Sequence, residues 1–150
     1  FRLRLALMAN RQRTKQLPPV HTVRRKSPNR AERRTWMLEN EEKTCVWCRR
    51  EFDERLIRPT TEHVVPKIKG GPSWIENEVM ACRRCNGLRG HQTPGDWIDR
   101  CRERGWEPNV PLVLKRLENL QKAISQRGGQ RRARPYIRAQ IRRLQNRIDP

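Results

Sequence analysis

The last third of the chain has the most regular spacing of apolar residues. They recur at intervals of four, three and four in two runs, which are Val113, Leu117, Leu120 and Ile124, then Ile137, Ile141, Leu144 and Ile148. This spacing places each run on one side of a helix, so it predicts two amphipathic helices. Only a short link containing Gly128-Gly129 separates them, which favours an antiparallel hairpin. The apolar stripes would form the core of this hairpin, and they would also suit a homodimer interface.

Three shorter helices are predicted before this hairpin. Asn29 fits the N-cap of a helix that runs to about Glu42. Partial burial is predicted for three of its residues, which are Ala31, Trp36 and Leu38. Thr93-Pro94 fits the start of a helix that extends to Arg104, and a short helix is expected over residues 83–89.

Strand signals are weaker. Residues 58–65 are rich in Thr and Val and are bounded by prolines. They predict the second strand of a hairpin whose first strand begins near Cys48. Residues 67–73 form a glycine-rich basic turn, and a short strand is expected near Val79.

Four of the five cysteines form two pairs, Cys45/Cys48 and Cys82/Cys85, each with two residues between the partners. Two such pairs are typical of one tetrahedral Zn²⁺ site with four thiolate ligands and no open position. A redox dithiol uses a single pair, so it does not account for both. Zinc would also stabilise a chain with few apolar residues, because metal-binding free energy adds to folding free energy.

The charge is large and unevenly distributed. The 150 residues carry a formal net charge of +19, and only 34% of them are hydrophobic. Counting Lys and Arg against Asp and Glu, residues 1–30 carry +9, residues 31–100 carry +1 and residues 101–150 carry +9. Two basic arms therefore flank a nearly neutral centre. A charge of this size predicts a polyanionic partner, since solubility alone would not require it.

Cysteine usage and hydropathy bear on the compartment. The fifth cysteine, Cys101, has no partner in the pattern, which suits a reducing compartment such as the cytoplasm. No run of about 18 apolar residues occurs, so no transmembrane span is expected. Residues 1–8 are too few and too charged for a secretory signal, whereas an Arg-rich start without acids also fits an organellar transit segment.

The region between the cysteine pairs resembles a known family. The residues that carry the resemblance are Glu62-His63, Pro66, Gly70-Gly71, Asn77, Cys82-x-x-Cys85-Asn86, Gly90 and Thr93-Pro94. Their order and spacing resemble those of the HNH endonucleases, the ββα-metal nucleases, over residues 45–94. The resemblance implies a hairpin and a short helix held together by zinc, and it implies hydrolysis of phosphodiester bonds.

The resemblance also implies roles for four residues. His63 would be the general base that deprotonates a water for attack on phosphorus, a task that suits a neutral imidazole with a pKa of about 6.5. Glu62 and Asn86 would hold a catalytic Mg²⁺ or Mn²⁺ through oxygen ligands. Family members often have Asp at the position of Glu62 and His at that of Asn86. Asn77 would pin the loop that orients the base, although an ordinary Asx-turn would look the same in the sequence.

Basic residues surround this motif. Those predicted to contact nucleic-acid phosphates are Arg58, Lys67, Lys69, Arg83, Arg84 and Arg89. The outer face of the C-terminal hairpin adds a further set, which is Arg131, Arg132, Arg134, Arg138, Arg142, Arg143 and Arg147.

Together these features predict an α+β fold, a small zinc-stabilised ββα-metal domain with basic helical N- and C-terminal extensions. We expect a basic arm over residues 1–28, an HNH-like nuclease domain with flanking helices over 29–104 and a basic helical hairpin over 105–150. The predicted function is metal-dependent endonuclease cleavage of DNA.

Two alternatives stay open. One is a non-catalytic zinc-stabilised module that binds DNA or RNA, and the other is a structural part of a nucleoprotein assembly with a decayed nuclease motif. The four residues with implied roles favour the enzyme, because a binding module needs only the cysteines.

Overall fold

The computed structural model describes residues 27–148 of the chain, so residues 1–26 of the predicted N-terminal arm lie outside the described residues. The helices are α1 (Arg30–Asn40), α2 (Arg83–Arg89), α3 (Pro94–Glu103), α4 (Val110–Arg127) and α5 (Ala133–Ile148). The strands are β1 (Pro59–His63) and β2 (Glu78–Cys82), and two 3₁₀ turns, η1 (Lys67–Lys69) and η2 (Ile75–Asn77), lie between them. These elements confirm the predicted α+β class. None of the described helices is long and apolar enough to cross a membrane.

The sheet consists of β1 and β2 in antiparallel register, with Pro59 opposite Cys82 and His63 opposite Glu78. The predicted pairing of residues 58–65 with a strand near Cys48 is therefore wrong, whereas the short strand near Val79 is confirmed. The segment after Cys48 forms only two isolated bridges. Its backbone turns sharply instead, with a positive φ of 63° at Arg49 and a turn in which Asp53 accepts hydrogen bonds from two backbone amides.

Helix α1 begins as its sequence predicts. The Asn29 side chain accepts a hydrogen bond from the Glu32 backbone amide, and the Glu32 side chain accepts one from the Asn29 amide, which is a capping box. The predicted partial burial is confirmed for Leu38 but is wrong for Ala31 and Trp36, which are exposed. The residues that α1 buries are Arg33 and Met37. Trp36 is 45% exposed. Arg33 turns inward because a buried carboxylate on β2 pairs with it.

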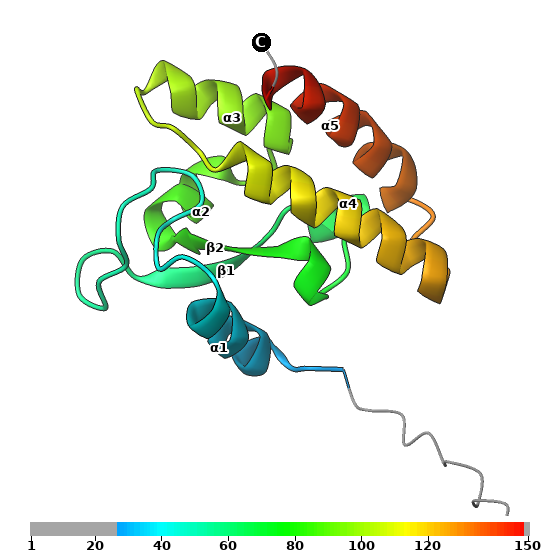
Figure 1. Ribbon diagram of the computed structural model, residues 1–150, viewed down its shortest axis with the longest axis horizontal. Coiled ribbons are helices and arrows are strands. Elements are labelled where there is room, and N and C mark those ends of the chain that lie inside the picture. The colour runs from blue at the N-terminus through cyan, green and yellow to red at the C-terminus, as the bar shows by residue number, and fades with distance from the viewer. Residues whose placement is uncertain (1–26, 149–150) are drawn as a thin grey trace, which may run out of the picture.

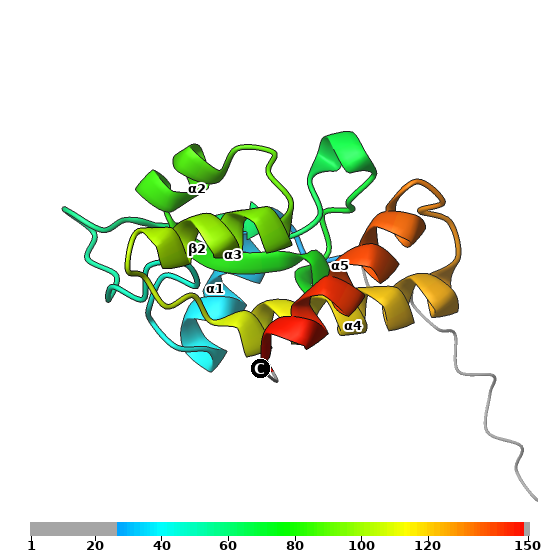
Figure 2. The same cartoon turned by 90° about the horizontal axis from the view of Figure 1, so that it is seen from above.

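Helices α2 to α5 confirm the predicted elements. Thr93 caps α3 through the amide of Asp96, and Pro94 occupies its first turn. Helices α4 and α5 pack together as an antiparallel hairpin, while α3, α4 and α5 lie on one side of the sheet and α1 lies on the other (Figure 1). Figure 2 shows α5 beside α3, where Arg143 and Arg147 form ion pairs with Asp99. These two arginines of the predicted basic face are therefore partly neutralised.

One apolar core joins the sheet to the C-terminal hairpin. It contains Val64 and Val79 of the sheet region, Trp97 of α3, Leu117 of α4 and Leu144 of α5. The apolar stripes of α4 and α5 are thus buried within the chain except for Ile148, which is 37% exposed, and this matches their predicted use as hairpin core.

Candidate active site

The four paired cysteines converge on one point. Their sulfur atoms all lie within 4.8 Å of one another, and Sγ of Cys48 is 4.0 Å from Sγ of Cys82. Four sulfurs around one Zn²⁺ ion at about 2.3 Å would be separated by about 3.8 Å. The cluster therefore fits a four-thiolate zinc site, and it joins the loop before β1 to the junction of β2 and α2.

The pKa values of three thiols in the cluster are shifted in different directions. The pKa of Cys45 is lowered to about 5, mainly by a hydrogen bond with Cys85, and the same contact raises the pKa of Cys85. Burial also raises the pKa of Cys82. One thiolate is thus already favoured without a metal, and a bound cation would favour deprotonation of the other sulfurs as well.

His63 lies at the end of β1 with its side chain 22% exposed. Its Nε2 atom is 3.1 Å from Oγ of Ser73 and 3.7 Å from Oε1 of Glu78. Burial lowers the pKa of His63, although the nearby Glu78 carboxylate acts in the opposite direction. The lowered pKa favours the neutral imidazole that a general base needs.

Glu78 is a component of this site that the sequence did not reveal. It is fully buried, and its two carboxylate oxygens accept hydrogen bonds of 2.7 and 2.9 Å from Arg33. The only sequence signal is an acidic residue at the start of an apolar run, which says nothing of its partner. Its place opposite His63 follows from the strand register.

Asn77 fastens the loop between β1 and β2. Its side chain accepts a hydrogen bond from the Val65 amide at 2.8 Å and donates to the carbonyls of Val65 and Pro72 at 3.0 and 2.9 Å. Gly71 packs so closely that a Cβ atom there would lie 1.8 Å from the Val65 oxygen. These contacts hold the loop that carries Ser73 to His63.

Glu62 points away from His63, because neighbouring side chains of a strand alternate between faces. It is only 4% exposed, and burial raises its pKa. One carboxylate oxygen pairs with Arg89 at 3.1 Å, and the other accepts a hydrogen bond from the Trp47 indole. Glu62 therefore does not fit as an open ligand for a divalent ion in this arrangement. Asn86 lies partly exposed on α2.

The predicted phosphate contacts divide into two groups. Arg58, Lys67, Lys69, Arg83 and Arg84 are exposed. Arg89 is only 1% exposed, and its guanidinium also donates to the backbone oxygens of His63 and Val64. It is thus used inside the protein, so the contact predicted for it is not available in this structure.

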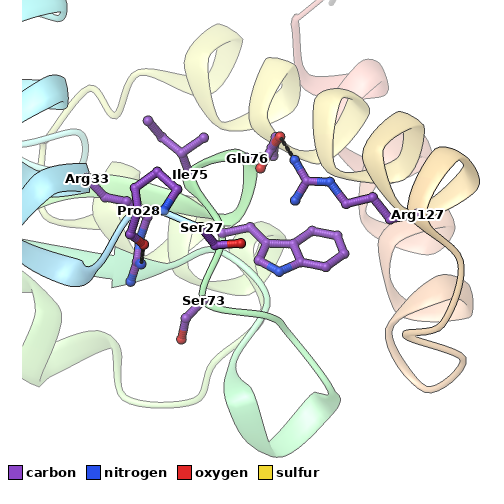
Figure 3. Close-up of a pocket in the computed structure, with 8 residues that line it drawn as sticks. Ser27, Pro28, Arg33, Ser73, Ile75, Glu76 and Arg127 are labelled. Atoms are coloured by element: carbon purple, nitrogen blue, oxygen red, sulfur yellow. Dashed lines mark hydrogen bonds and ion pairs between the residues drawn. The ribbon is translucent and has the colours of Figure 1, made fainter. Parts of the chain in front are cut away.

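Ser73, whose Oγ contacts His63, lines a cavity of about 480 Å³. Figure 3 shows the residues that line this cavity. Arg33 lines one side of it and Arg127, from the end of α4, lines another. Arg127 pairs with Glu76 at 2.9 Å and stacks over the Trp74 ring at 4.4 Å. The cavity is therefore linked to the imidazole through Ser73, the hydrogen-bond partner of His63.

Comparison with known proteins gives one match. Residues 45–101 match the family model described as HNH endonuclease. Searches of the curated proteins and of the solved structures found no match. The matched segment begins at the first zinc-type cysteine, includes His63 and Asn77, and ends within α3. Over residues 45–101 this chain is therefore similar to the HNH endonucleases, as its sequence motif predicts.

Proposed function

We propose that this protein is a metal-dependent endonuclease that hydrolyses phosphodiester bonds within DNA strands, with His63 as the general base. The observation that carries the proposal is the setting of His63. It is a partly exposed imidazole in the segment of HNH type, burial lowers its pKa, and its hydrogen-bond partner Ser73 lines a cavity. A net charge of +19 supports a nucleic-acid substrate.

The contacts of the ring favour a different role for each of its two nitrogen atoms. Because Nε2 lies near Oγ of Ser73 and Oε1 of Glu78, it would carry the proton and donate it to these acceptors. Nδ1 would then take the proton from a water molecule. The resulting hydroxide attacks phosphorus, the bond from phosphorus to the 3′-oxygen breaks, and that oxygen takes up a proton from solvent.

A requirement for Mg²⁺ or Mn²⁺ is part of the proposal and rests on the family. Asn86 is a candidate ligand, while Glu62 could bind an ion only after it released Arg89 and Trp47. The engagement of Glu62 favours a second candidate, a zinc-stabilised nucleic-acid-binding module without catalysis. In either case the four cysteines would hold a structural Zn²⁺.

Incubation with supercoiled plasmid separates the two functions. Purified protein with Mg²⁺ or Mn²⁺ should convert the plasmid to nicked or linear forms, and the His63→Ala variant should do so far more slowly. Wild-type protein that binds the plasmid but cuts it with neither ion would leave the binding module as the function.

A further inference from the structure

Four arginines from three parts of the chain meet at one edge of the sheet. They line a cavity of about 480 Å³ beside Pro59 and Thr60 of β1, and they are Arg30, Arg34, Arg58 and Arg83. We call this cavity the arginine pocket. Arg30 and Arg34 lie one turn apart on α1, so they share a face. Arg83 begins α2, and its amide donates to the Arg58 carbonyl at 3.0 Å, which holds the two segments together.

The positive charge of the arginine pocket is largely unbalanced. Glu54 is the one acidic residue that lines it, and its carboxylate lies 3.7 Å from Arg34. Arg30, Arg58 and Arg83 form no ion pair with any of the residues 27–148. Like charges held together repel one another, and a bound anion would relieve this repulsion. Several guanidinium groups around one cavity suit the oxygens of a phosphodiester.

The arginine pocket lies close to the candidate base. Nε of Arg30 donates to Oγ1 of Thr61 at 3.0 Å. Thr61 and His63 are two residues apart on β1, so their side chains share a face at a separation of about 7 Å. A strand whose backbone occupied the arginine pocket would therefore lie near the His63 imidazole.

We propose that the arginine pocket binds the phosphodiester backbone of the substrate strand next to the phosphate that is cleaved at His63, an inference that rests on the proposed function. The ligand class is the sugar–phosphate backbone, without discrimination between bases. The pocket adds Arg30 and Arg34 to the predicted contacts, and these residues belong to α1, outside the segment of HNH type.

The test compares two pairs of charge removals. Arg58→Gln/Arg83→Gln removes two of the four arginines that line the arginine pocket. The control pair, Arg100→Gln/Arg102→Gln, removes two exposed arginines from α3, on the other side of the sheet. Both pairs are made in the His63→Ala background, and binding of a short fluorescein-labelled DNA duplex is measured by anisotropy between roughly 50 and 200 mM salt. Loss of two phosphate contacts should reduce the slope of log affinity against log salt by about 1.8. The α3 pair should change the slope by less than half of this.

Equal slopes for the two pairs would overturn the proposal. Circular dichroism shows whether each variant folds, and Arg30→Gln/Arg34→Gln replaces the first pair if that pair does not fold. Cleavage is then measured for the same substitutions with His63 restored. A wild type that cuts no DNA while the pocket pair loses slope would defeat the proposed function and leave the pocket assignment standing. A wild type that cuts DNA while the pocket pair leaves the slope unchanged would support the proposed function and overturn the pocket assignment.

Discussion

Glu78 and His63 face each other across the two strands, with Oε1 of Glu78 3.7 Å from Nε2 of His63. The same carboxylate accepts two hydrogen bonds from Arg33 on α1. Glu78 therefore connects the candidate base to a helix that lies outside the segment of HNH type. Both members of the Arg33–Glu78 pair are buried, so neither can exchange its partner for water without cost.

Glu78→Gln should lower the free energy of unfolding by about 3 kcal/mol, because the Arg33 charge would stay buried without its counter-ion. Urea denaturation followed by circular dichroism measures this loss. Arg33→Gln/Glu78→Gln removes both charges and should lose less than the single variant. Glu54→Gln is the matched control, since Glu54 is highly exposed where it pairs with Arg34, and it should cost at most about 1 kcal/mol. Similar losses for Glu78→Gln and Glu54→Gln would contradict this account.

His63→Ala should slow DNA cleavage by roughly 10²–10⁴-fold, because it removes the proton acceptor. DNA affinity should change little, since the exposed arginines and the cysteine cluster are untouched. Single-turnover cleavage and anisotropy titration on the same duplex measure the two quantities. Ser73→Ala removes only the hydrogen bond to Nε2 and should have a smaller effect on the rate. A His63→Ala protein that cleaves at the wild-type rate would exclude His63 as the base.

The cysteine cluster predicts about one tightly held zinc per chain. Cys48→Ser should lose this zinc and with it much of the fold, because metal-binding free energy contributes to folding. Elemental analysis after dialysis against a chelator gives the zinc content, and circular dichroism gives the fold. Cys101→Ser is the control, since Cys101 is buried but lies outside the cluster, and it should keep the zinc. A folded wild-type protein without metal would refute the prediction.

Gly71→Ala should destabilise the loop beside His63, because the added Cβ would lie 1.8 Å from the Val65 oxygen and 2.8 Å from Nδ2 of Asn77. Thermal denaturation should show a clearly lower midpoint. Gly87→Ala provides the opposite case within α2. Nothing lies within 4 Å of a Cβ at that position, so the helix should gain about 0.5–1 kcal/mol. Equal midpoints for the two variants would mean that the loop does not pack as described.

The elements that the sequence predicted correctly depend on neighbours in the chain. Asn29 caps α1 through Glu32, and Thr93 caps α3 through Asp96, so both signals lie within one helical turn. The sequence does not predict that β1 pairs with β2, because a long loop separates the two strands. The pairing is determined by which side chains become buried when the chain folds, and neighbouring residues do not reveal this. For the same reason the contact between Glu62 and Arg89, 27 residues apart, could not be predicted, and neither could the place of Glu78 beside His63.

Glu62 can act either as the buried partner of Arg89 or as a ligand of the catalytic ion, and the two roles predict different properties for Glu62→Gln. As a buried partner of Arg89 it should stabilise the fold, and Glu62→Gln should then lower the free energy of unfolding by about 3 kcal/mol, with or without divalent ions. High Mn²⁺ should not restore the cleavage that this variant loses, because the defect would lie in the packing of Arg89 and Trp47. Glu62→Gln/Arg89→Gln should recover part of the stability, since no unpaired charge stays buried. If Glu62 instead binds the catalytic ion, Glu62→Gln should unfold at the wild-type midpoint and regain cleavage as Mn²⁺ is raised. Denaturation and cleavage measured on the same preparations over a range of Mn²⁺ decide between the two roles.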